Sequence, residues 1–98
     1  MEDVTVHIGA LYTELFIPLS GSLKSKRSVL KSLKDRIKNR FNVCVAEIGA
    51  QDKWQRAVLG FAAISSDKTH LDQALQGILS FVKDNHDVEL IDYSMEFL

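Results

Sequence analysis

Residues 57–64 form an unbroken apolar run, Ala-Val-Leu-Gly-Phe-Ala-Ala-Ile, in the second half of the sequence. Because the run is short and follows a loop-forming segment, it predicts a strand over residues 54–65. Successive side chains of a strand point to opposite faces, and this strand is apolar on both faces beyond Arg56. Such a strand belongs in the middle of a sheet.

Hydrophobic periodicity places five further elements around this strand. Alternating apolar and polar side chains predict strands, and apolar residues three and four apart predict helices. Ser22 is the predicted N-cap of the first helix, and Ser66 or Asp67 that of the second. A hairpin loop is expected at residues 49–53. The predicted strands lie at residues 4–17, 42–48 and 88–97, and the predicted helices at 23–40 and about 68–84.

The predicted order strand–helix–strand–strand–helix–strand fits one domain over residues 1–98. Two right-handed crossovers around a hairpin give a ferredoxin-like fold of the α/β (α+β sandwich) class. In this fold a four-stranded antiparallel sheet carries both helices on one face. The other face of the sheet is left open.

The open sheet face is expected to be apolar, because two strands have more apolar side chains than one face needs. The central strand directs Leu59, Phe61 and Ala63 to one side and Val58, Ala62 and Ile64 to the other, and the last strand carries Ile91, Tyr93, Met95 and Phe97. An exposed apolar area of several hundred Å² is usually an interface. We therefore expect a homodimer that forms through the open sheet face.

Charge is strongly segregated along the chain, although the net charge is only −1. Residues 22–41 contain eight basic residues and a single acidic one, Asp35, which gives this segment a charge of +7. The rest of the chain has a charge of −8. A positive segment in an otherwise acidic protein favours a polyanion as its partner.

The basic residues of the first predicted helix gather on one flank of its apolar stripe. At 100° per residue, this flank holds Arg27, Lys31, Lys34 and Lys38, which form a ridge that runs nearly the length of the helix. Several Lys and Arg side chains in a row can release counterions from a nucleic-acid backbone. The alternative is a helix face that is simply solvated. The candidate nucleic-acid-binding residues are Lys24, Arg27, Lys31, Lys34 and Lys38.

A second candidate site lies at the hairpin end, where a tryptophan stands among polar residues. Its side chain could stack on a base or anchor a protein partner. Alternatively, Trp54 caps the sheet while Asp52 satisfies loop amides. The candidate partner-binding residues are Asp52, Trp54, Gln55 and Arg56.

No pattern in the sequence indicates catalysis, a metal or a cofactor. The three histidines are scattered without metal-ligand spacing, and the five glycines form no phosphate loop. The single cysteine, Cys44, is expected to be a small core residue. Glu47 and Asp52 flank one hairpin, where acidic residues are usually part of the turn. No signal peptide and no apolar span are evident, so a cytoplasmic, non-enzymatic protein is expected.

Two segments resemble motifs of a known family. Leu23-Lys-Ser-Lys-Arg27, directly after an Ile-Pro turn, resembles a Ser-Leu-Lys-x-Lys-Arg motif. Phe41-Asn-Val-Cys-Val-Ala-Glu47, followed by Gln51-Asp-Lys-Trp-Gln-Arg56 and Leu59-Gly60, resembles Asn-Val-x-Val-x-Glu…Gln-Asp-x-Trp-Gln-Arg. The two motifs that these segments resemble are those of the YlxP-like family of small bacterial proteins, a domain of unknown function.

The resemblance implies a ferredoxin-like fold, dimers and a cytoplasmic bacterial setting. It also implies work around RNA or the ribosome, because family members are often encoded beside transcription-elongation and translation-initiation factors and a ribosome-binding factor. It implies no catalytic residues. The sequence thus favours a homodimeric RNA- or ribosome-associated binding protein. The alternative is a homodimeric protein-interaction or small-ligand regulatory module. Salt dependence separates the two, because only RNA binding weakens steeply with salt.

Overall fold

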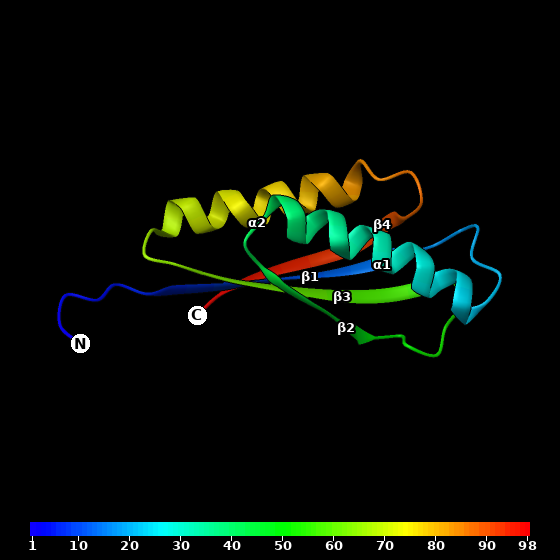
Figure 1. Ribbon diagram of the computed structural model, residues 1–98, viewed down its shortest axis with the longest axis horizontal. Helices are drawn as coiled ribbons and strands as arrows, with labels where there is room; N and C mark the ends of the chain where they lie inside the picture. The colour runs from blue at the N-terminus through cyan, green and yellow to red at the C-terminus, as the bar shows by residue number, and fades with distance from the viewer.

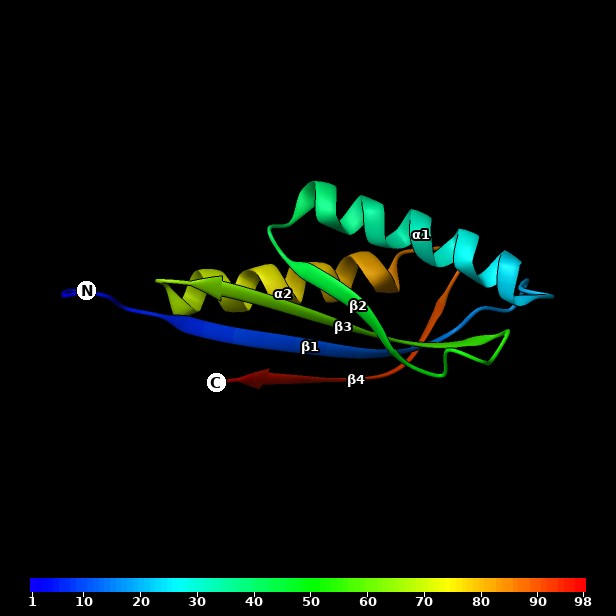
Figure 2. The same cartoon turned by 60° about the horizontal axis from the view of Figure 1, so that its bottom comes forward.

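The computed structural model describes the chain from Met1 to Leu98, with two helices lying on one face of a four-stranded antiparallel sheet (Figure 1). The strand order is β2-β3-β1-β4, which is the ferredoxin-like arrangement predicted from the sequence. Turning the molecule shows no element on the other face of the sheet (Figure 2). The elements are β1 (His7–Phe16), α1 (Leu23–Arg40), β2 (Cys44–Gly49), β3 (Arg56–Ser65), α2 (Lys68–Lys83) and β4 (Glu89–Phe97).

Both helices begin at a capping side chain. The hydroxyl of Ser22 accepts a hydrogen bond from the backbone N–H of Ser25 at 3.0 Å, so Ser22 caps α1 as predicted. Of the two predicted caps for α2, Asp67 is the one used, because its carboxylate accepts from the N–H groups of Thr69 and His70. Each cap satisfies helix-end donors that would otherwise lack a partner.

All four strands are shorter than their sequence pattern predicts, and β1 and β3 differ most in length from the prediction. β1 begins at His7 and not at residue 4, because His7 pairs with Ser65, the last residue of β3. β3 begins at Arg56 and not at residue 54, because its partner Phe16 is the last residue of β1. In β1 and in β3 the alternation of apolar and polar residues continues in the sequence beyond the last residue that can form backbone hydrogen bonds with the neighbouring strand.

The hydrophobic core lies between the sheet and the helices. β3 is a central strand, as predicted, and its residues Ala57, Leu59 and Phe61 are buried against the helices. A fully buried Leu or Phe side chain contributes about 1.5–3 kcal/mol relative to an exposed one. The remaining core residues are Leu11, Leu15, Ile17, Leu30, Leu33, Ile37, Leu71, Leu75, Ile78, Leu79, Val82 and Val88.

The open sheet face divides into an apolar part and an acidic part. The apolar part covers β2, β3 and the first half of β1, and includes the exposed isoleucines Ile8, Ile48 and Ile64. Cys44 also lies there with its side chain exposed, so its predicted place in the core is wrong. The side chains of β2 alternate, and Cys44 falls on the strand face that points away from the helices.

β4 supplies the acidic part, which corrects the expectation that its apolar surplus serves the open face. Tyr93 pairs with the buried Thr13, and Phe97 lies beside Gly9 under α2, so both turn to the helix side. The open face of β4 therefore carries the residues that alternate with Tyr93 and Phe97, namely Asp92, Ser94 and Glu96.

Candidate functional site

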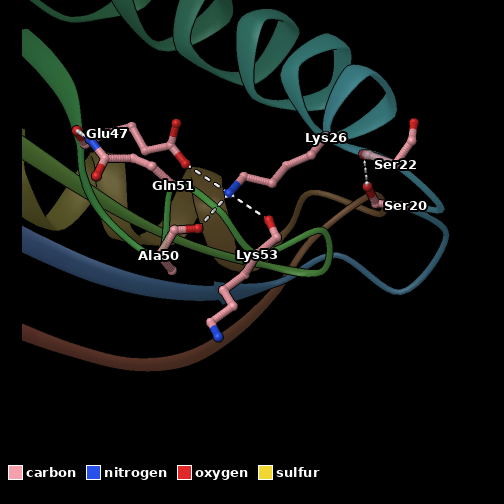
Figure 3. A network of polar contacts seen from close by, with 7 residues as sticks. All are labelled: Ser20, Ser22, Lys26, Glu47, Ala50, Gln51 and Lys53. Carbon is pink, nitrogen blue, oxygen red and sulfur yellow. Dashed lines mark hydrogen bonds and ion pairs between the residues drawn. The ribbon is translucent and has the colours of Figure 1, made fainter.

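Lys26 is buried in α1, although lysine is rarely found without solvent. It lies in the same helical stripe as Leu30 and Leu33, and its side chain reaches from α1 to the loop between β2 and β3 (Figure 3). The ammonium group donates to the carbonyl of Ala50 at 2.7 Å and to that of Lys53 at 2.8 Å. These bonds compensate the loss of water around the charge.

Glu47 supplies the counter-charge for this buried ammonium group. Its Oε2 lies 2.9 Å from Lys26 Nζ, close enough for an ion pair but not aligned for a hydrogen bond. Oε2 is buried and has no other polar partner, while the side chain as a whole is 22% exposed. The pair links α1 to the end of β2.

The β2–β3 loop is held in place at several points. Ala50 has a φ of 56°, in the left-handed region that costs a non-glycine residue roughly 1 kcal/mol. Its carbonyl accepts from both Lys26 and the N–H of Lys53. The amide of Gln51 donates to the carbonyl of Glu47 at 3.3 Å. Figure 3 shows these groups gathered around the end of the Lys26 side chain.

The same loop is tied to the segment between β1 and α1. The carbonyl of Gln55 accepts from the N–H of Ile17 at 2.9 Å, and the Gln55 side chain donates to the carbonyl of Pro18 at 3.0 Å. Residues 17–22 and 50–55 therefore lie side by side at one end of the molecule (Figure 1). We call these two segments together the loop end.

The predicted partner-binding residues are all exposed, but the structure gives them different environments. Trp54 is 56% exposed at the loop end, so it does not cap the sheet as a buried residue would. Asp52 makes no side-chain hydrogen bond, so it does not satisfy the loop amides. Gln55 holds the loop, and Arg56 lies 3.4 Å from Glu14 on the open face. Trp54 and Asp52 are thus the two that remain available to a partner.

The predicted nucleic-acid-binding residues share one flank of α1, which we call the basic ridge: Lys24, Arg27, Lys31, Lys34 and Lys38. All are exposed except Lys34, which is half-buried. The opposite flank of α1 faces α2, where the guanidinium of Arg40 lies 5.1 Å from the ring centre of Phe81. Because α1 packs between α2 and β2, the basic ridge faces away from α2 and overhangs the edge strand β2.

One residue of the basic ridge is paired with an acid. Lys31 Nζ donates to Asp35 Oδ2 at 2.8 Å, one helical turn away. The hydrogen bond and the opposite charge raise the pKa of Lys31 and lower the pKa of Asp35. The other salt bridges of the protein are Lys26–Glu47 and Arg56–Glu14. The remaining four cations of the ridge therefore have no carboxylate partner.

The acidic part of the open face lies on the other side of the molecule. There the hydroxyl of Tyr12 donates to Glu96 Oε2 at 3.2 Å, and the charge of Glu96 raises the pKa of Tyr12. No group of three or more His, Cys, Asp or Glu side chains is placed to hold a metal ion. Neither helix is both long and apolar enough to cross a bilayer.

Sequence reasoning missed Lys26 as a distinct residue and counted it with the other basic residues of the helix. The spacing of residues 26, 30, 33 and 37 could have revealed it, because these positions form one stripe along the helix. Since the other three residues of the stripe are apolar and face the core, the lysine at position 26 must also face inward.

Comparison with known proteins supports the family that the two motifs indicate. A family described as "Protein of unknown function (DUF503)" matches residues 8–95. "Uncharacterized protein YlxP" of Bacillus subtilis (strain 168) is 44% identical over 82 residues, which cover 84% of this chain and 89% of that protein. The matched range contains the basic ridge, the loop end and all of the strands except the first residue of β1 and the last two residues of β4.

Proposed function

Because the chain belongs to the DUF503 family, whose function is unknown, we propose a function from its own surface: it binds RNA, free or within a ribosomal particle, through the basic ridge of α1. The observation that carries the proposal is the set of four unpaired cations on one flank of one helix. Charge of one sign, presented in a row, attracts a phosphate backbone and raises the association rate.

The geometry of the ridge suits a polyanion. From Lys24 to Lys38 the helix rises about 21 Å, which is long enough to meet several phosphates. The ridge faces away from the acidic part of the open sheet face, so an RNA bound there would not meet those carboxylates. Contacts to phosphates are nearly independent of sequence, so the shape of the RNA would provide selectivity.

The open sheet face does not offer the RNA-binding mode of sheet-based recognition domains. Those domains stack bases on aromatic side chains of the central strands. Here β3 carries Val58, Gly60, Ala62 and Ile64 on that face, none of which is aromatic. The other central strand, β1, places Tyr12 and Phe16 there, but the hydroxyl of Tyr12 donates to Glu96, whose charge would repel a phosphate backbone. The basic ridge is therefore the surface that we propose for a nucleic acid.

A charge-reversed variant tests the proposal. Lys34→Glu combined with Lys38→Glu should weaken binding to a structured RNA and reduce the slope of log affinity against log salt by about one for each phosphate that the ridge no longer neutralises. The matched control, Lys68→Glu with Lys83→Glu, changes the net charge equally on α2. Equal loss of affinity in both variants would mean that only the net charge of the protein matters and not the position of the ridge. Unchanged binding in the ridge variant would mean that the ridge is only a solvated helix face and does not bind RNA.

We also propose that the open sheet face joins two copies of the chain. A hollow of about 280 Å³ lies over its apolar part, lined mainly by small residues of three strands: Ala10, Cys44, Ala46, Gly60 and Ala62. The width of four strands multiplied by the length of the 10-residue β1 gives this face an area of about 600 Å² if it is treated as flat. The solvent-accessible area is larger, because side chains project from the sheet. A stable interface needs about 800 Å² of accessible surface from each partner, so the face is near that size.

A further inference from the structure

Trp54 is the only tryptophan of the chain and is unusual in being more than half exposed. Tryptophan is mostly buried in folded proteins, because its ring has a large apolar surface. An exposed tryptophan on a flexible loop would lose much conformational freedom on binding. Trp54 instead lies on a loop whose backbone is held by hydrogen bonds.

The backbone on both sides of Trp54 is fixed by hydrogen bonds. The carbonyl of Lys53 accepts from the buried ammonium of Lys26 at 2.8 Å, and the carbonyl of Gln55 accepts from the N–H of Ile17 at 2.9 Å. The loop thus presents the indole ring from a preorganised backbone, which lowers the entropic cost of binding a partner. Lys26 acts here as a positioning residue.

Trp54 also lies at the same end of the molecule as the start of the basic ridge. Lys26 contacts the residue before Trp54, and its neighbours Lys24 and Arg27 are the first two cations of the ridge. The ammonium end of Lys53 points away from Lys26 in Figure 3 and adds an exposed cation to the loop. The exposed Asp52 carries the one negative charge of this loop.

We infer that Trp54 forms a stacking site for an unpaired RNA base, beside the phosphates held by the basic ridge. The inference rests on the proposed function and specifies its ligand: RNA with a single-stranded or bulged nucleotide next to the segment that the ridge contacts. Unpaired bases expose their faces, and aromatic side chains stack on them with little preference for sequence. Cations beside the ring hold the adjoining phosphates.

Intrinsic fluorescence tests the inference directly, because the emission of the protein at tryptophan wavelengths comes from Trp54 alone. Titration with single-stranded oligoadenylate should quench this emission to saturation. Heparin, a polyanion without bases, should compete with a dye-labelled RNA in anisotropy measurements and leave the emission unchanged. Binding of oligoadenylate by anisotropy without quenching would overturn the inference alone. Absence of any RNA binding would overturn the proposed function as well.

The Trp54→Ala variant separates stacking from charge. It should weaken the binding of labelled oligoadenylate about 5- to 100-fold, the range for loss of one base stack. Its salt slope should stay that of the original protein, because stacking releases no counterions. A changed slope with unchanged affinity at moderate salt would contradict the stacking role.

Three further variants test whether Lys26 positions Trp54 and whether binding at the loop end requires an aromatic ring. Lys26→Met should retain the salt slope of the ridge but lose the quenching by oligoadenylate, and Glu47→Gln should do so to a smaller degree if Lys26→Met does not fold. Leu19 is 90% exposed in the neighbouring segment and serves as the matched control. Leu19→Ser should leave RNA binding unchanged, because an aliphatic side chain offers no ring on which a base can stack. A loss equal to that of Trp54→Ala would show that any apolar side chain at the loop end supports binding, and would overturn the stacking inference.

Discussion

The ammonium nitrogen of Lys26 lies 2.9 Å from Oε2 of Glu47, and the two side chains are 2% and 22% exposed. This contact joins the first half of α1 to the end of β2, two elements that are separated by the turn at Phe41. The same nitrogen donates to two carbonyls of the β2–β3 loop. One side chain therefore fixes both the helix and the loop that carries Trp54.

Replacing Lys26 should destabilise the fold strongly. Lys26→Met leaves the buried oxygen of Glu47 without its partner, and loss of one member of a buried ion pair costs about 3 kcal/mol or more. Urea unfolding followed by circular dichroism measures the change. The exposed control Lys24→Met should stay within about 0.5 kcal/mol. The double variant Lys26→Met with Glu47→Gln should lose less than the two single variants added together, and strict additivity would mean that the pair is not coupled.

Removing the acid from the basic ridge should strengthen RNA binding. Asp35→Asn frees Lys31 for a phosphate, so the salt slope should steepen by about one. The pKa of Asp35 is lowered, so the original protein keeps this pair intact as the pH falls until the lowered pKa is reached. The control Asp92→Asn removes the same charge from the open face and should leave the slope unchanged. A steeper slope in both variants would mean that only the net charge matters.

A charged residue in the apolar part of the open face should prevent dimerisation. Ala62→Glu would bury two unpaired charges, one from each copy, at a cost of at least about 3 kcal/mol, which corresponds to an increase of about 150-fold or more in the dimer dissociation constant. Light scattering over a concentration series measures the oligomeric state. Ser80→Glu, on the exposed side of α2 and away from this face, is the control. A monomer at about 100 μM in the original protein would remove the dimer proposal.

The hydroxyl group of Tyr12 should lose its proton only at a higher pH than an ordinary tyrosine does. Glu96 raises the pKa of Tyr12 above its ordinary value of 10.0, first by its charge and then by accepting the hydroxyl hydrogen. Stability from this contact is therefore present below that value and is lost as the pH rises through the pKa of the folded protein. Ultraviolet absorbance of tyrosinate in a Tyr93→Phe background follows Tyr12 alone. Adding Glu96→Gln should lower the midpoint, and an unchanged midpoint would contradict the contact.

The helices were the most predictable part of the fold. The spacing of Leu30, Leu33 and Ile37 predicts α1 with both of its ends, because a serine caps the start and the periodicity stops at Phe41. The ends of the strands were less predictable, because a strand ends where the neighbouring strand no longer offers it backbone hydrogen bonds. Residues 4–6 alternate like the rest of β1, but β3 ends opposite His7 and leaves them without a partner.

The face of a short strand could not be decided from its pattern. Cys44, Ala46 and Ile48 form the more apolar set, because the set that alternates with them includes the charged Glu47. The set with Glu47 nevertheless turns inward, because Lys26 neutralises this carboxylate. The position of the basic ridge followed from helical geometry alone. The Lys26 contact did not, because it joins residues 24 positions apart in the sequence and depends on the path of the loop.

The position of the basic ridge above β2 has a consequence for how copies of the protein meet. β2 is hydrogen-bonded only to β3, so the outward-facing N–H and C=O groups of its other edge are free to accept another strand. A second β2 edge would bring a second row of lysines and arginines against the first. Repulsion between the two rows opposes such edge-to-edge growth, so the side chains that we propose for RNA binding also disfavour aggregation through this strand.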